Sequence, residues 1–330
     1  MIDEWKQRMR AEWDLRARQD AEYFIYTRDT SGDVDDFAKS GEANYNQLVR
    51  PYLPMLLSGR EASVCNVVEI GCGIGRMTEF FARDFASVAA LDVAPAMIEG
   101  ARNRLSHLSN VAFHVGTGAD LQPVPTASAD LVFSYIVFQH IPSRAVIESY
   151  FSEAARVLRD GGTFKFQVNG DQSEAYLAHE RDTWLGETFS VAEVTHMLAE
   201  SGFTVIAMEG AGTQYFLIAA CKGVFRGGGY VLPGDAALLE GFGAPVDSSW
   251  SPLMSPARVR LTGEGSRLYA GIYFWPGASE TVLTLAGYRF EVSCPGDHYF
   301  EFAGSAGEVE IQMDPVPARP PAFRIIGLRV

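Results

Sequence analysis

The stretch Val67-Val68-Glu69-Ile70-Gly71-Cys72-Gly73-Ile74-Gly75-Arg76 decides the fold, because it reads as a buried strand that enters a glycine turn and opens a helix. The apolar residues before Gly71 are typical of a strand covered on both faces. The alternating glycines let backbone N–H groups approach a ligand without obstruction by side chains. Asp92 ends the next short apolar run, and a carboxylate at that place can bind a ribose diol. The sequence therefore predicts a nucleotide-type cofactor on this turn.

The spacing of the glycines separates two cofactor classes. A dinucleotide fingerprint is G-x-G-x-x-G, but here the third glycine falls one position early, at Gly75, and Arg76 stands where that site needs close helix packing. The pattern E-x-G-x-G-x-G, which begins at Glu69, resembles motif I of the class I S-adenosylmethionine-dependent methyltransferases. A nicotinamide-dependent oxidoreductase is the less favoured alternative, and a preference for NAD over S-adenosylhomocysteine would identify it.

Residues that match the adenine site of this family follow in order. Val93 and Met97 resemble the apolar residues that sandwich the adenine ring in the family. Thr117, after the third predicted strand, stands where many members have Asp or Asn. A hydroxyl accepts a hydrogen bond from an amino group less well than a carboxylate does, so we expect the backbone of Gly118 and Ala119 to serve instead.

The segment from Asp130 to Ile141 resembles motif IV, in which the fourth strand runs out into the reaction centre. The resemblance implies that the backbone at Ser134 and Tyr135 binds the methionine amine of the cofactor. His140, at the mouth of the strand, is the candidate general base, since its ordinary pKa lies near 6.5. A structural, hydrogen-bonded His140 is the alternative interpretation.

The cofactor site implied by the resemblance lies beyond the carboxyl ends of the strands. Cys72 is expected to fill space in the turn rather than to act as a nucleophile, and the sequence predicts no metal site. We expect the substrate pocket to include Tyr23 and Tyr26 in the N-terminal cap together with Phe138 and Gln139. The cofactor-binding residues are predicted to be Glu69, Gly71, Cys72, Gly73, Gly75, Arg76, Asp92, Val93, Met97, Thr117, Gly118, Ala119, Ser134 and Tyr135.

The order of the elements predicts an α/β fold. Strand and helix patterns alternate between residues 61 and 222, which indicates a Rossmann-like, seven-stranded, doubly wound sheet. Residues 1–60 are expected to form a helical cap or lid, because their apolar residues follow helical spacing. A linker over 223–250 and a β-sandwich accessory domain over 251–330 complete the predicted organisation.

Short β-rich runs separated by turn residues recur from residue 257 onward. They loosely resemble the β-sandwich modules of bacterial polysaccharide-modifying enzymes, through the entry Trp250-Ser251-Pro252 and the final residues 324–330. A sugar-stacking platform and an oligomerisation surface are both open roles for this domain, as is a plain core for its aromatic residues. The aromatic residues concerned are Trp250, Tyr269, Tyr273 and Trp275.

Composition sets limits on the partners. The formal charge of −14 argues against nucleic acid. No apolar run approaches the roughly 20 residues of a membrane helix, so we expect a soluble protein. The four cysteines have no paired spacing, which argues against a disulfide framework and fits a cytoplasmic protein. The predicted substrate is a small molecule or a glycan, and the β domain is a candidate surface for a homo-oligomer.

These observations predict an S-adenosylmethionine-dependent methyltransferase that O-methylates a sugar, a glycan or a related small molecule by in-line transfer. Two alternatives stay open. One is a non-catalytic nucleotide-fold module within a glycan-assembly complex, and the other is an N-methyltransferase of a small metabolite.

Overall fold

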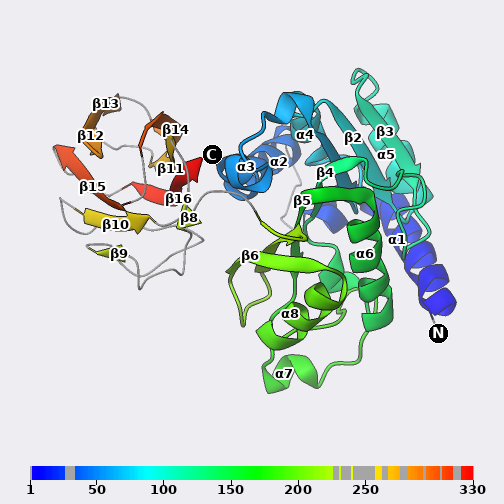
Figure 1. Cartoon of the computed structure of the whole chain (residues 1–330). Coiled ribbons are helices and arrows are strands. Elements are labelled where there is room, and N and C mark those ends of the chain that lie inside the picture. The colour runs from blue at the N-terminus through cyan, green and yellow to red at the C-terminus, as the bar shows by residue number, and fades with distance from the viewer. Residues whose placement is uncertain are drawn as a thin grey trace. The chain divides into compact units, whose positions relative to one another are not determined.

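The computed structural model describes residues 2–26, 34–225, 230–231, 239–240, 257–261, 267–275, 281–292, 295–304, 307–314 and 321–329. The chain divides into two compact units (Figure 1). The first unit contains Met1–Tyr45 and Arg60–Phe225, and the second contains Asn46–Gly59 and Arg226–Val330. Residues 46–59, which the sequence places within the cap, therefore group with the C-terminal unit.

A seven-stranded sheet forms the centre of the first unit, in the order β3-β2-β1-β4-β5-β7-β6. Strands β1 to β5 run parallel, while β7 lies antiparallel between β5 and β6. This arrangement confirms the predicted Rossmann-like sheet. The strands are β1 (Asn66–Ile70), β2 (Ser87–Asp92), β3 (Val111–Val115), β4 (Ala129–Ser134), β5 (Leu158–Val168), β6 (Phe203–Glu209) and β7 (Phe216–Lys222).

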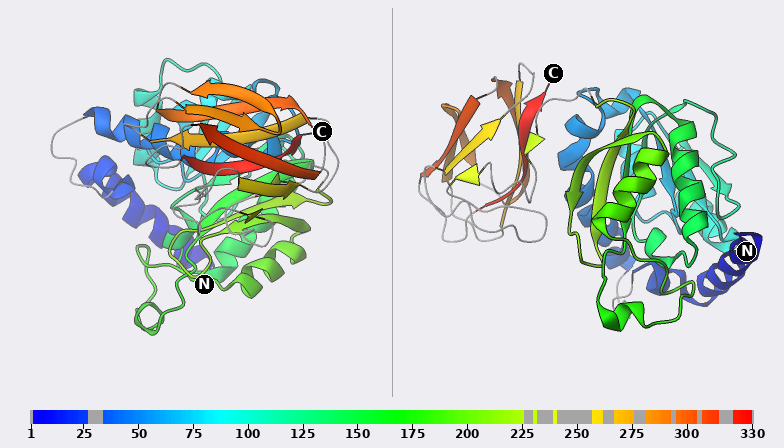
Figure 2. Two further views of the ribbon diagram at one scale, coloured as in Figure 1. Left: turned by 90° about the vertical axis from the view of Figure 1, so that its left-hand side faces the viewer. Right: turned by 60° about the horizontal axis from the view of Figure 1, so that its bottom comes forward.

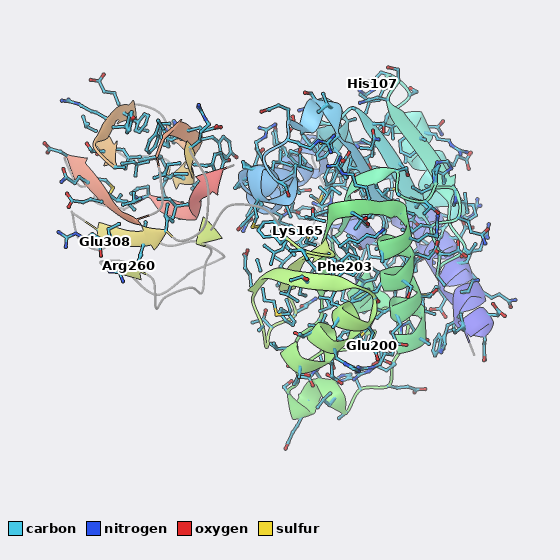
Figure 3. The ribbon with its side chains drawn as sticks, in the orientation of Figure 1. His107, Lys165, Glu200, Phe203, Arg260 and Glu308 are labelled. Carbon is cyan, nitrogen blue, oxygen red and sulfur yellow. The ribbon has the colours of Figure 1, made fainter. Side chains whose placement is uncertain are left out.

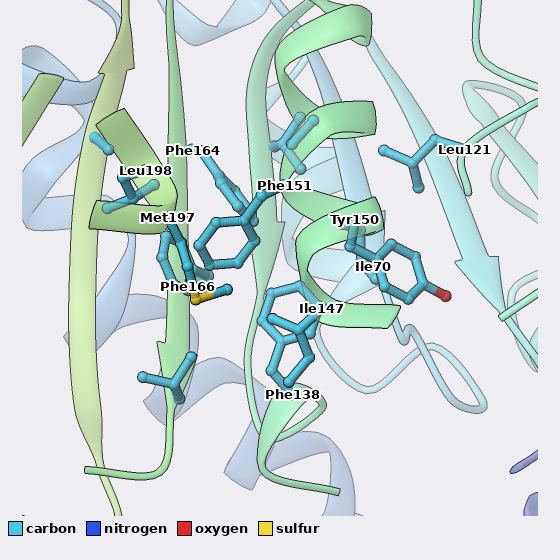
Figure 4. Close-up of a cluster of buried hydrophobic side chains, with 14 of the residues drawn as sticks. Ile70, Leu121, Phe138, Ile147, Tyr150, Phe151, Phe164, Phe166, Met197 and Leu198 are labelled. Carbon is cyan, nitrogen blue, oxygen red and sulfur yellow. The ribbon is translucent and has the colours of Figure 1, made fainter. Parts of the chain in front are cut away.

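Helices cover both faces of this sheet. On one face, α6 (Arg144–Val157) and α8 (Val191–Glu200) bury a core that includes Phe164 and Phe166 of β5 (Figure 4). Lys165 points to the opposite face, because side chains alternate along a strand (Figure 3). On that opposite face, α4 (Thr78–Asp84) places Phe81 against the sheet, 5.1 Å from the ring of Phe133.

The first unit has further helices in addition to α4, α6 and α8. They are α1 (Ile2–Ile25), α2 (Val34–Leu48, whose last residues belong to the second unit), η2 (Ala62–Val64), α5 (Pro95–Arg104), η3 (Phe138–His140) and α7 (Glu174–Leu177). The backbone of α1 leaves helical geometry at Asp20, where φ is −165°. In the described residues, no helix has the length and the apolar character that spanning a membrane requires.

Two element boundaries differ from the predictions. The polar and acidic stretch from Asp29 to Lys39, which includes Gly32, predicts a loop, but α2 already covers that stretch from Val34 onward. The apolar run from Thr163 to Val168, after the glycine pair at 161–162, predicts the fifth strand. The observed β5 begins earlier, at Leu158, because Leu158 pairs with Ala129 of β4 ahead of an irregularity in the ladder. Gly161 lies within that irregular stretch with a φ of +77°, which a glycine adopts without strain.

The second unit is a sandwich of two antiparallel sheets, as predicted (Figure 2). Their orders are β13-β12-β15-β10-β9 and β14-β11-β16-β8. The apolar side chains that alternate along β10, β11, β12 and β15 meet in one core. The strands are β8 (Tyr230–Val231), β9 (Leu239–Glu240), β10 (Ala257–Leu261), β11 (Arg267–Phe274), β12 (Thr281–Leu285), β13 (Tyr288–Val292), β14 (Gly296–Ala303), β15 (Gly307–Asp314) and β16 (Ala322–Arg329).

Two further features belong to this unit. The short helices η1 (Arg50–Tyr52) and α3 (Leu53–Leu56) precede the first unit's sheet in the chain, and η1 contacts β16. On the outer side of the sandwich, Arg260 of β10 pairs with Glu308 of β15 (Figure 3). The predicted entry segment Trp250-Ser251-Pro252 lies outside the described residues.

Candidate active site

A pocket opens in the first unit where β1, β2 and β4 end. The chain runs outward from β1 to β2 and β3, and then crosses back to β4 on the other side of β1. The strand order therefore reverses between β1 and β4, and ligands bind to open α/β sheets at such a switch point. The space within and at the mouth of the pocket is about 1060 Å³, which includes space open to solvent. It is lined by Met9, Trp13, Phe24, Ile25, Glu69, Ile70, Gly71, Cys72, Gly73, Arg76, Met77, Leu91, Asp92, Val93, Met97, Gly116, Gly118, Asp120, Phe133, Tyr135, Ile136, Val137, His140, Ile141 and Tyr150.

Most of the predicted site residues meet in this wall. Eleven of them line it: Glu69, Gly71, Cys72, Gly73, Arg76, Asp92, Val93, Met97, Gly118, Tyr135 and His140. The others lie behind or beside it: Gly75, Thr117, Ala119, Ser134, Phe138, Gln139, Tyr23 and Tyr26. Phe138 is fully buried in the core, whereas Tyr23 is 46% exposed.

The glycine turn is shaped by backbone hydrogen bonds. The N–H groups of Gly71 and Cys72 both donate to the carbonyl of Leu91, at 2.8 and 3.0 Å. Gly73 has a φ of +54°, and a Cβ atom there would lie 2.6 Å from Cδ1 of Ile25. A side chain at Gly73 would therefore strain the backbone and collide with α1.

Asp92 ties the end of β2 to this turn. Its Oδ2 accepts a hydrogen bond from the Gly73 N–H, and its Oδ1 accepts one from the Ala94 N–H, both at 2.9 Å. Burial raises the pKa of this carboxyl to about 6, although the backbone N–H groups oppose the shift. Each oxygen keeps a second lone pair for a ligand hydroxyl.

Two buried charged residues flank the turn. Glu69 accepts a hydrogen bond from the Thr78 hydroxyl at 2.6 Å, and burial raises its pKa to about 7. Arg76 donates from Nη1 to Asn44 at 2.6 Å and lies with its guanidinium 5.7 Å from the ring of Tyr26. The Nε atom of Arg76 is buried and has no hydrogen-bond partner in the described structure. An anionic ligand group would satisfy this donor.

His140 uses both of its ring nitrogens within the protein. Nδ1 lies 2.8 Å from the carbonyl oxygen of Trp184, so Nδ1 carries the proton, because a carbonyl only accepts. Nε2 is then the acceptor, 3.1 Å from the amide nitrogen of Gln139. Burial lowers the pKa of His140 to about 4. The imidazole is therefore neutral at neutral pH, and the lone pair of Nε2 is already bonded.

A chain of buried amides fixes this arrangement. The Ile136 N–H donates to Oε1 of Gln167 at 3.1 Å, and Nε2 of Gln167 donates to Oε1 of Gln139 at 3.0 Å. Gln139 then donates to His140. Ile136 lines the pocket with a φ of +55°, which is rare for a β-branched residue. The amide chain therefore holds a strained loop in place at the pocket wall.

Helix α1 supplies four lining residues that the sequence did not assign to the site: Met9, Trp13, Phe24 and Ile25. The ring of Trp13 packs 5.3 Å from His140, and the side chain of Arg16 donates to Thr183 at 2.9 Å. Asp14 accepts a hydrogen bond from the Ala96 N–H at 2.7 Å, at the start of α5. These contacts hold α1 across the pocket.

Asp120 and Tyr150 also line the pocket without having been predicted. Asp120 follows the unremarkable loop after β3, and Tyr150 lies in an ordinary amphipathic helix, so neither has a motif that could have identified it. Over the described ranges, no group of three His, Cys, Asp or Glu side chains is arranged to hold a metal ion.

Comparison with known proteins shows which family the region around this pocket resembles. A family model described as a methyltransferase domain matches residues 68–166. The malonyl-[acyl-carrier protein] O-methyltransferase of Hahella chejuensis is 39% identical over 107 residues, which cover 31% of this chain and 36% of that protein. The trans-aconitate 2-methyltransferase of Methylobacterium nodulans is 33% identical over 131 residues, 39% of this chain and 48% of that protein. The chain thus spans less than half the length of these two relatives.

A solved structure shares the fold. The Haemonchus contortus phosphoethanolamine N-methyltransferase 1, in complex with phosphoethanolamine and S-adenosylhomocysteine, matches with a TM-score of 0.50 and 18% identity, over 66% of this chain and 49% of that chain. The region matched by the family model contains both the glycine turn and Asp92. Residues 68–166 match a methyltransferase domain, and the sequence and fold of the first unit resemble those of the class I S-adenosylmethionine-dependent methyltransferases.

Proposed function

We propose that this protein binds S-adenosylmethionine in the pocket of the first unit and transfers its methyl group to a small-molecule acceptor. The observation that carries the proposal is the hydrogen bond between Asp92 and the Gly73 N–H, which joins the ribose-binding carboxylate to the glycine turn. The pocket offers the donors and acceptors that this cofactor needs, on elements that the sheet holds in fixed positions.

The parts of the cofactor correspond to separate groups of residues. The remaining lone pairs of Asp92 would accept the ribose hydroxyls. The unpartnered Nε of Arg76 would donate to the methionine carboxylate, and Glu69 would steady the turn through Thr78. The backbone at Ser134 and Tyr135 would bind the methionine amine, and Val93 and Met97 would face the adenine ring.

When bound, S-adenosylmethionine supplies an electrophilic methyl group on a sulfonium. The protein's contribution is then to orient the acceptor and to exclude water. The aromatic residues of α1, Trp13 and Phe24, cover the pocket beside His140. His140 is better suited to position the pocket wall than to accept a proton, since both of its ring nitrogens are bonded within the protein.

We propose oxygen as the acceptor atom. Sugars and sugar nucleotides are the first acceptors to screen, because the β-sandwich unit loosely resembles glycan-associated modules. Carboxylic acids come next, since the two similar proteins named above are a malonyl O-methyltransferase and a trans-aconitate methyltransferase. A carboxylate also needs no base, because it is ionised at neutral pH.

Isothermal titration of the whole chain with S-adenosylhomocysteine and with NAD tests the cofactor. We expect binding of S-adenosylhomocysteine alone, and binding of NAD alone would overturn the proposal. Transfer of a labelled methyl group to the acceptor panel tests the reaction. Alkaline treatment then separates methyl esters, which release methanol, from methyl ethers, which do not. Cofactor binding without transfer to any acceptor would favour the non-catalytic module.

A further inference from the structure

One wall of the pocket contains polar groups that the proposed site has not yet used. This wall lies at the end of β3, two strands away from the glycine turn in the order β3-β2-β1. Neighbouring strands lie about 4.8 Å apart, so the end of β3 lies roughly 10 Å from the turn. Asp92 holds the place between them, at the end of β2. The end of β3 is therefore within reach of the base of a nucleoside whose ribose is bound by Asp92.

The space for a base at this wall depends on Gly118. Its φ is +93°, and a Cβ atom there would lie 3.1 Å from Cγ2 of Val93 and 3.6 Å from Cε of Met9. Met97 is buried beside this space and also lines the pocket. The missing side chain of Gly118 thus leaves an apolar slot between helix α1 and the end of β2.

Asp120 provides the carboxylate of this wall. The Thr117 hydroxyl donates to its Oδ2 at 2.7 Å, and the Gln122 N–H donates to its Oδ1 at 3.3 Å. Each oxygen keeps a lone pair, because a carboxylate oxygen accepts two hydrogen bonds. Asp120 lines the pocket, whereas Thr117 does not.

Tyr150 offers a second polar group to a ligand at this wall. It is 7% exposed and lines the pocket, and its hydroxyl is directed away from Phe138 and Phe151 (Figure 4). Burial raises the pKa of this hydroxyl, and the charges of Asp92 and Asp120 add to the effect. No residue in the described structure forms a hydrogen bond with this hydroxyl, which leaves it available to a ligand.

We infer that Asp120 accepts a hydrogen bond from the adenine amino group of the cofactor, and that Thr117 positions the carboxylate for it. The inference rests on the proposed S-adenosylmethionine site. Thr117 stands where a direct acceptor is expected, and here it acts through its neighbour instead. Asp120 is thus a specificity-determining residue that distinguishes a base with an amino group from one with a carbonyl group.

The test compares S-adenosylhomocysteine with S-inosylhomocysteine, which carries a carbonyl oxygen in place of the amino group. Isothermal titration should show that the wild-type chain binds the adenosyl compound about 10- to 100-fold more tightly, as expected for a hydrogen bond to a charged acceptor. Asp120→Asn should reduce or reverse this preference, because an amide can donate to the carbonyl oxygen. Asp160→Asn, an exposed aspartate elsewhere in the chain, should leave the preference unchanged.

Two variants of Thr117 test its positioning role. Thr117→Val removes the hydroxyl at nearly constant size and should reduce the preference, and Thr117→Ser should restore it. An unchanged preference in Asp120→Asn, in a variant that still binds S-adenosylhomocysteine, would overturn this inference alone. Failure of the wild-type chain to bind S-adenosylhomocysteine would overturn the proposed function and this inference with it.

Discussion

His140 links the protonation of one buried side chain to the stability of the fold. The pKa of His140 is about 4 in the folded chain and near 6.5 when unfolded, because burial disfavours the charged imidazolium. Its contribution to the free energy of unfolding is therefore complete above pH 6.5 and is lost as the pH falls toward 4. The free energy of unfolding should fall by about 2 kcal/mol between pH 7 and pH 5 from this group. Denaturant titrations at both pH values measure the change. His140→Gln should show a smaller fall, and an equal fall would contradict the assignment.

Asp92 should make cofactor binding depend on pH. Its pKa of about 6 means that the ionised carboxylate, which accepts the ribose hydroxyls, is lost as the pH falls below that value. Titration calorimetry with S-adenosylhomocysteine from pH 8 to pH 5 should show weakening affinity below about pH 6. Asp92→Asn should bind about 10- to 100-fold more weakly at pH 8. A wild-type affinity that is constant over this range would refute the role of Asp92.

Arg76 can be tested with a truncated ligand. If its Nε atom binds the methionine carboxylate, Arg76→Met should weaken binding of S-adenosylhomocysteine about 10-fold or more. The same variant should bind 5′-methylthioadenosine, which lacks the amino acid, as the wild-type chain does. Equal weakening for both ligands would show that Arg76 acts only on the shape of the turn.

Residues of the site were predictable where the sequence carries a motif. The glycine turn and Asp92 have fixed spacing because a strand, a turn and a helix follow one another within a few residues. Met9, Asp120 and Tyr150 reach the pocket from elements that pack there only in the folded chain. No short-range sequence pattern corresponds to this tertiary packing, so these three residues could not be predicted from the sequence. The state of His140 was equally hidden, since Trp184 lies 44 residues away.

At the scale of elements, helix α1 should respond to the loss of a single contact. Asp14 accepts a hydrogen bond from the Ala96 N–H, so Asp14→Ala leaves the start of α5 without this acceptor, at a cost of about 1 kcal/mol. Hydrogen exchange of residues 2–25 should accelerate, and the affinity for S-adenosylhomocysteine should fall a few-fold. Asp3→Ala is the matched control, because Asp3 lies on the same helix with its side chain exposed. Equal exchange in both variants would contradict the proposed anchoring.

Element boundaries were predictable where a capping or turn signal is strong. Helix α8 begins at a capping box formed by Ser190 and Glu193, a pattern that lies within four consecutive residues. The start of β5 was not predictable, since it is set by the pairing of Leu158 with Ala129 across the sheet. Part of helix α2 was predicted as a loop, because residues 29–39 are polar and acidic and include Gly32.

At the scale of the whole molecule, the two units should be separable in their energetics. Ile272 is fully buried in the core of the sandwich, so Ile272→Ala should lower the free energy of unfolding of that unit by about 2–5 kcal/mol. The affinity for S-adenosylhomocysteine should stay within about twofold, since the pocket lies in the first unit. Scanning calorimetry and titration together check both expectations. A large loss of affinity would show that the two units are coupled.

The β-rich character of the C-terminal half was predictable from its short runs and turn residues. The membership of residues 46–59 in that unit was not. This grouping depends on contacts such as that between η1 and β16, which join distant parts of the chain and leave no periodic pattern in either one. Sequence patterns report residues that are close along the chain, whereas η1 and β16 are close in space but distant in sequence.

The contact between η1 and β16 also affects how the protein is made. Residues 50–52 leave the ribosome long before β16, which follows roughly 270 residues later in the chain. Protein synthesis proceeds at about 5–20 residues per second, so the delay is on the order of 15 to 50 seconds. Tyr52, Leu56 and Leu57 are almost fully buried in the finished protein. The contact between η1 and β16 can therefore form only late in synthesis, well after residues 50–52 have left the ribosome.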